Sequence, residues 1–279
     1  MLIILNDIEE NEQVIDELAD KIFVETLFLR DLDKFFKHII EAVRIDLESS
    51  EKKRFVTETK QIDIERMFSD EIDFLLKLNY ARGAQQVIKR FVEDPFVNEL
   101  YSKQEIRRIV DETMSNINGY VVRRTNLVVP EILKTTENNI SQAQVFVAKI
   151  ITDAEISITE AEKNSMIIDN LTDRLENRKE GIAVTETNNI YENSKQILGG
   201  YVDEKLSKQG ESLDKRWSAF LDHKTRRAHA MAHGQRVPQA SLYNVGGEYL
   251  MYPTDTSHGA SVKNTINCRC ESVLTLIRG

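Results

Sequence analysis

The chain has 279 residues, 41% of them hydrophobic, and a formal net charge of −9, which is enough sequence for one large core or two smaller ones. No apolar run approaches the ~18 residues of a membrane span, and the first residues turn acidic at once, unlike a secretion signal. The two cysteines, spaced i, i+2, make no disulfide framework, so we expect synthesis in a reducing cytoplasm.

Charge and helix breakers divide the chain in the same way. Residues 201–279 carry 11 Lys+Arg and 8 Asp+Glu, whereas residues 1–200 carry 26 and 38. Two glycines fall in residues 1–180 and nine in residues 181–279. Few breakers favour helices, and many favour turns and strands. We therefore expect an α+β protein, with a long, mostly α-helical, partner-binding region at 1–180. A small α+β domain with a β-hairpin and a terminal strand should follow at 181–279.

The N-terminal region carries apolar residues at helical spacing. Residues 28–40 contain a phenylalanine-rich stripe that is typical of core packing. Ser102 followed by Glu105 fits a capping box and predicts that a helix begins there. His38 is the region's only histidine, and we find no catalytic constellation around it.

The C-terminal domain is expected to begin with a helix. Thr185 is a plausible N-cap, and Gly199-Gly200 would end the helix through a left-handed C-cap. Glu186 would lie in the first turn, where the positive helix end favours a carboxylate. The alternative for Glu186 is a buried acid that holds one of the downstream arginines.

A strand and a second helix should follow. Residues 215–221 alternate around the only tryptophan, as in a strand. Asp222 is a candidate N-cap for a helix over 223–233, which Gly234 could stop. Three side chains would share one face of that helix: Arg226, His229 and His233.

The remaining elements are predicted to be strands. Residues 241–245 and 248–252 flank Gly246-Gly247, a good two-residue hairpin turn because glycine tolerates positive φ. Residues 266–277 alternate like a terminal strand, which would point both cysteines to the core-facing side.

Several of these segments resemble a known family as a series. They are Ala183-Val184-Thr185-Glu186-Thr187, Trp217 with Asp222-His223-Lys224-Thr225-Arg226-Arg227-Ala228-His229 and Gly234, Tyr252-Pro253-Thr254-Asp255, and Ile266-Asn267-Cys268-Arg269-Cys270. Their order and spacing resemble the phage Mu protein F-like minor head protein family, a group of phage head morphogenesis proteins.

The resemblance implies a function in the virion. Members are minor components of tailed-phage heads, present in few copies, that associate with the portal or the capsid interior. They act in head assembly and DNA packaging or delivery. For this chain it implies a non-enzymatic protein of the virion head, synthesised in the host bacterial cytoplasm. Its partners would be the portal and the major capsid or scaffold protein, with packaged DNA as a further candidate and no membrane.

The matching residues imply a structural polar cluster rather than a catalytic site. In this interpretation, which needs no cofactor, hydrogen bonds tie the short helix to the last strand. The expected members are Glu186, Asp222, Arg226, His229, Asp255, Asn267, Cys268, Arg269 and Cys270.

A zinc site is the alternative for part of that cluster. Some relatives carry cysteines at the positions that match Arg226 and His229, and His-Pro before the Cys-Arg-Cys, which suggests a four-ligand zinc site. Arg226 cannot bind a metal. This chain would leave His229, Cys268 and Cys270, with His233 or His258 as the fourth ligand.

Two other functions stay open. A hydrolase or nuclease could use His229 and His233 with Asp222 or Glu186 in general acid–base chemistry, although the sequence contains no nucleophile elbow, phosphate loop or H-E-x-x-H motif. A DNA-contacting module would instead use a basic cluster in an acidic chain. Its candidate residues are Arg216, Lys224, Arg226, Arg227 and Arg236.

Overall fold

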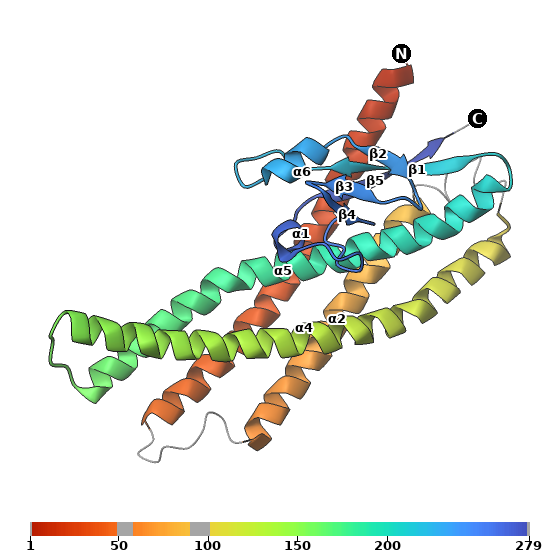
Figure 1. The fold of residues 1–279 in the computed structure, drawn as a ribbon. Helices are drawn as coiled ribbons and strands as arrows, with labels where there is room; N and C mark the ends of the chain where they lie inside the picture. Colours follow the sequence, from red (N-terminus) through yellow and green to blue (C-terminus); the bar gives the residue numbers. More distant parts are fainter. Residues whose placement is uncertain (1, 49–57, 90–100, 278–279) are drawn as a thin grey trace. The chain divides into compact units, whose positions relative to one another are not determined.

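The computed structural model describes residues 2–48, 58–89 and 101–277. Helices make up 69% of it, and the strands lie in the C-terminal part, so the expected α+β class is confirmed. Four long helices come first (Figure 1): α1 (Leu2–Glu48), α2 (Glu58–Val87), α4 (Lys103–Asp153) and α5 (Glu160–Ser207). Among the described residues, none of the helices contains a stretch long and apolar enough to span a membrane.

Capping boxes fix the starts of α4 and α5. The backbone N–H of Ser102 donates to Glu105 Oε2 at 2.9 Å, and the N–H of Glu105 donates back to Ser102 Oγ at 3.2 Å. Thr159 and Glu162 repeat the arrangement before α5, at 2.7 and 3.2 Å. Each box satisfies N–H groups that a helix start would otherwise leave without partners. The box at Ser102 confirms the sequence prediction.

The chain divides into two compact units, and the helices contribute to both. One unit comprises residues 27–74 and 120–181. Its core contains the phenylalanine-rich stripe of α1, with Phe28 and Phe36 almost fully buried. Polar contacts join its helices: Lys179 pairs with Asp33 at 3.1 Å, and Asn164 donates to a backbone carbonyl of α1 at 3.0 Å.

The other unit comprises residues 1–26, 75–119 and 182–279 and contains both sheets. The antiparallel order β2–β1–β5 joins Arg236–Pro238, Ser212–Ser218 and Glu271–Ile277. A hairpin pairs β3 (Tyr243–Val245) with β4 (Glu248–Leu250). Two short helices, α6 (Arg227–Ala232) and α7 (Val262–Thr265), lie between the strands in sequence. In Figure 1 the sheets, drawn in cyan to blue, lie beside the C-terminal part of α5.

Two predicted strands and the hairpin turn are present. Trp217 lies in β1, fully buried, although the alternation stops early and Leu221 is 63% exposed. Gly246 and Gly247 have φ of 62° and 89°, as the two-residue turn requires. The last strand begins at Glu271, not at residue 266.

The prediction that a helix begins at Thr185 is wrong. α5 runs unbroken from Glu160 to Ser207, so Thr185 caps nothing and Gly199-Gly200 lies inside the helix. Glu186 is therefore in mid-helix, 7% exposed, and not in a first turn. The predicted boundary at residue 180 lies within α5, close to the division between the two units after Gly181.

In the same unit, α2 and α5 approach closely at Gly83. A Cβ atom added to Gly83 would overlap the Ser194 hydroxyl and would lie 2.6 Å from the carbonyl oxygen of Tyr191. Near this point the side-chain amide of Asn79 donates to the carbonyl of Thr187. The glycine is therefore required by the helix contact rather than by a turn.

Candidate functional site

The two parts of the sequence motif meet in the structure. The guanidinium of Arg269 donates to Asp222 Oδ1 at 2.7 Å, and that of Arg226 donates to the carbonyl oxygen of Ile266. We call residues 222–229 and 266–270, joined in this way, the C-terminal clasp.

The Asp222 side chain closes a turn at the start of the first clasp segment, residues 222–229. Its Oδ1 also accepts the N–H of Lys224 at 2.9 Å and the hydroxyl of Thr225 at 3.0 Å. These bonds, the one from Arg269 above all, hold the pKa of Asp222 well below its usual range. Because the carboxylate closes a turn, α6 begins only at Arg227, with Arg226 as N-cap. The predicted helix over 223–233 with an Asp222 cap is therefore too long.

The centre of the clasp is an imidazole beside two thiols. His229 Nδ1 lies 3.3 Å from Cys270 Sγ and 3.5 Å from Cys268 Sγ. The three residues are 2%, 3% and 1% exposed, respectively. The pKa of Cys268 is lowered, chiefly by hydrogen bonding with Cys270 and further by hydrogen bonding with His229. Burial acts in the opposite direction and raises this pKa. The Trp217 ring meets the imidazole edge-on at 5.6 Å.

The backbone that carries the cysteines is held by two residues of α5. Asn188 Nδ2 donates to the carbonyl oxygens of Cys268 and Cys270, both at 2.9 Å. Asn267 adopts a φ of 53°, a conformation that asparagine tolerates better than most residues. Its N–H donates to Thr185 Oγ1 at 2.7 Å. The clasp therefore rests on α5.

Asn188 belongs to a polar, buried face of α5 that the sequence interpretation missed. Asn189 donates to the carbonyl of Thr254 at 3.0 Å, and Asn193 donates to the Tyr252 hydroxyl at 2.9 Å. Glu192 accepts the N–H of Ser272 at 2.8 Å. Residues 186–195 are all buried. The sequence gives no local signal for this face, because polar residues are typical of exposed helix faces; only the tertiary partners that buried polar groups need mark it.

A second polar cluster surrounds Lys215 in β1. Its ammonium group donates to the carbonyl of Met251 at 2.6 Å and to Gln196 Oε1 at 3.0 Å. Burial lowers its pKa to about 7, although the carboxylates of Asp255 and Glu192 oppose the shift. A buried lysine that bonds mainly to neutral acceptors is costly to protonate.

Asp255 lies in a turn of its own. It accepts the N–H groups of Met251 and Ser257, both at 2.8 Å, and contacts His258 Nδ1 at 2.8 Å. Glu186 is buried within α5.

The remaining histidines are engaged elsewhere. His233 Nδ1 accepts the N–H of Ala219 at 3.0 Å, and His258 contacts Asp255. Neither belongs to the group formed by His229 and the two cysteines, whose candidate ligand atoms all lie within 4.8 Å of one another. The expectation of a fourth ligand from His233 or His258 is therefore wrong. Three residues of the hydrolase alternative, Asp222, His229 and His233, each contact a different partner.

The DNA-binding candidates form two groups. Arg216 and Arg236 are cross-strand neighbours in β1 and β2. Lys224 and Arg227 are exposed at the clasp turn and at the start of α6.

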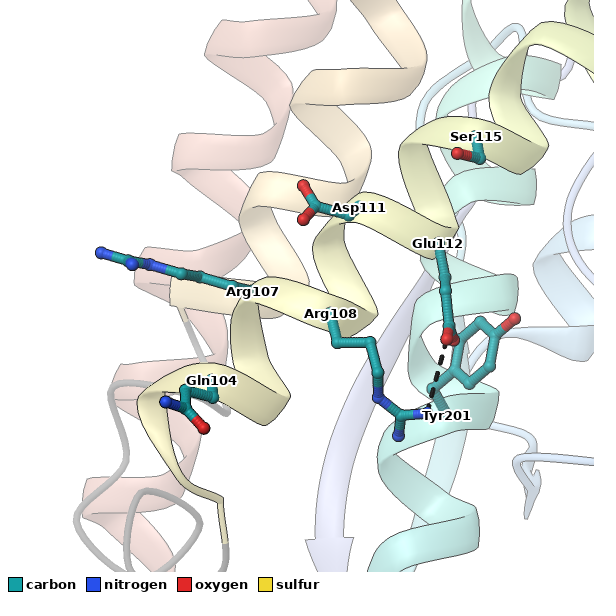
Figure 2. A pocket seen from close by; sticks show the side chains of 7 residues that line it. All are labelled: Gln104, Arg107, Arg108, Asp111, Glu112, Ser115 and Tyr201. Carbon is teal, nitrogen blue, oxygen red and sulfur yellow. Dashed lines mark hydrogen bonds and ion pairs between the residues drawn. The ribbon is translucent and has the colours of Figure 1, made fainter.

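The described residues of this unit contain at least two hollows. A mostly apolar cavity of about 300 Å³ adjoins the clasp and is lined in part by Cys268, Phe220 and Arg269. A shallower hollow lies between α4 and Tyr201 (Figure 2). There Arg108 pairs with Glu112 at 3.4 Å, whereas Arg107 points away from them. Only the first hollow touches the motif residues.

Among protein-family models, curated proteins and solved structures, none matches this chain. The likeness to the Mu protein F-like family therefore rests on the motif residues alone.

Proposed function

We propose that the chain is a minor head protein of a tailed bacteriophage. In this function it associates with the portal or the capsid interior and acts in head assembly and DNA packaging or delivery. The observation that carries the proposal is the C-terminal clasp. The segments that resemble the family, far apart in sequence, contact each other through Asp222–Arg269 and His229–Cys270.

The division of the chain supports the same proposal. The motif residues are largely buried or engaged in hydrogen bonds, so their contribution is to hold the C-terminal part together. The long helices α1 and α4 offer extended surface, as expected of a protein that docks on larger partners. A fold alone does not fix a function, so the proposal depends on the clasp and on the family likeness.

The test is to ask whether the chain is found with head components. The full chain, tagged, would be co-expressed with the portal protein encoded in the same genome, and purified heads would be analysed by quantitative mass spectrometry. We expect co-purification with the portal and a low, reproducible copy number in heads. An Asp222→Asn/Arg269→Gln double variant serves as a control with a weakened clasp. Absence of the intact chain from both preparations would contradict the proposal.

A second candidate is contact with packaged DNA. Arg216 and Arg236 are paired across adjacent strands, and residues 201–279 carry a net charge of +3, against −12 for residues 1–200. Phosphate contacts predict retention on DNA that falls steeply as salt rises. An Arg236→Gln/Arg227→Gln variant should elute at lower salt than the wild type. Equal elution of the two proteins would count against this candidate.

A further inference from the structure

We propose that His229, Cys268 and Cys270 bind a zinc ion through Nδ1 and the two Sγ atoms. The proposal stands independently of the function above. The motivation is geometric: three soft or borderline ligand atoms, from residues at most 3% exposed, all lie within 4.8 Å of one another.

The separations fit a metal with tetrahedral geometry. Zinc binds thiolate sulfur at ~2.3 Å and imidazole nitrogen at ~2.0–2.1 Å, which places adjacent nitrogen and sulfur ligands about 3.5 Å apart. His229 Nδ1 lies 3.3 Å from one sulfur and 3.5 Å from the other. The backbone therefore already presents the nitrogen to both sulfurs at nearly the spacing that zinc requires.

A zinc ion would link all three groups at once. Both thiols already converge on the same ring nitrogen. The ion would accept one lone pair from each of the three groups. On binding, each thiol loses its proton to solvent, so Zn²⁺, two thiolates and a neutral imidazole sum to zero charge. Neutrality removes the main cost of burying the ion and its ligands.

Neighbouring residues hold the ligands in position. Asn188 fixes the carbonyl groups of both cysteines, so both thiols are presented to one ring. Trp217 packs against the imidazole. Such outer contacts orient ligands and raise metal affinity.

The fourth position would be filled from outside the protein. Within the described residues, no further histidine, cysteine, aspartate or glutamate joins the group. The cavity lined by Cys268 would admit water or a small anion. Three protein ligands with one exchangeable position is an arrangement that zinc accepts.

The test uses the full chain purified without chelators, equilibrated with zinc and dialysed. Elemental analysis should find about one zinc per chain. Cobalt(II) substitution should give intense thiolate-to-metal absorption and the visible bands of a tetrahedral site. A Cys268→Ser/Cys270→Ser variant and a His229→Gln variant should each lose the metal. His223→Gln, at an exposed residue outside the group, should keep it.

Two results would overturn the proposal. One is folded wild-type protein that retains no zinc after equilibration and shows no cobalt–thiolate absorption, an outcome that does not depend on any variant folding. The other is metal that is retained undiminished by the double cysteine variant, which would place the ion elsewhere.

Discussion

Replacing Asn188 with alanine isolates the connection between α5 and the clasp. Its amide donates to two buried carbonyl groups, those of Cys268 and Cys270, at 2.9 Å each. A buried acceptor left without a donor costs ~1–3 kcal/mol, so the two losses together should lower the free energy of unfolding by about 3 kcal/mol. Asn188 is 3% exposed, which leaves little access for water to replace the amide.

The assay is urea denaturation of the full chain followed by tryptophan fluorescence. Trp217 is the only tryptophan and packs against His229, so its signal reports on the part of the chain that contains the clasp. Ser207→Ala is the matched control. Ser207 lies on the same helix and in the same unit but is exposed, and its hydroxyl donates within the helix, to the carbonyl of Glu204 at 2.9 Å. Equal losses of stability in the two variants would refute the reasoning.

Three further predictions concern packing, burial and the ion pair. Gly83→Ala should lower stability by ~1–3 kcal/mol because the added methyl group overlaps α5, whereas Gly200→Ala, with no atom within 4 Å of the new Cβ, should raise it by up to ~1 kcal/mol; destabilisation by both would show that the helix contact is not responsible. Since the pKa of Lys215 falls to about 7 on folding, the unfolded state binds more protons above pH 7, and stability should rise with pH between about 7 and 10. Urea midpoints compared at pH 7 and pH 9 should show that the Lys215→Met variant lacks this rise in stability. An unchanged rise in the variant would show that Lys215 is not its source. In a double-mutant cycle, the Asp222→Asn/Arg269→Gln variant should lose less stability than the sum of the losses in the two single variants. Strict additivity of the two losses would argue against the pairing of these side chains.

Local signals in the sequence predicted the turns and caps. Ser102 with Glu105, and Gly246-Gly247, act through contacts within a few residues, so the residue types alone identify them. The terminal strand and the tryptophan strand were also recognisable from alternation. Their ends were not, because Asn267 turns the chain before β5 and the pattern of apolar residues does not record that turn.

The α5 segment shows why the rest could not be predicted. Thr185 and the polar residues after it are typical of a helix start, and Gly199-Gly200 is typical of a helix end. The helix continues because Asn188 and its neighbours bond to residues ~65–80 positions later in the chain, and these tertiary contacts override local propensity.

The candidate site was only partly visible in the sequence for the same reason. The motif identified His229 and the cysteines as neighbours, and the structure brings them together. Asn188, Glu192 and Lys215 were missed, since nothing local distinguishes them from surface residues.

The reactivity of the two thiols tests the clasp most directly. Cys268 and Cys270 are the only cysteines, 1% and 3% exposed, so a bulky maleimide reagent should modify the native full chain slowly. In the urea-unfolded chain both thiols should react rapidly. Asp222→Asn should increase the native rate by weakening the bond to Arg269, the residue between the two cysteines. Rapid modification of both thiols in the native wild-type protein, at the rate seen in urea, would contradict the buried position beside His229 on which this account rests.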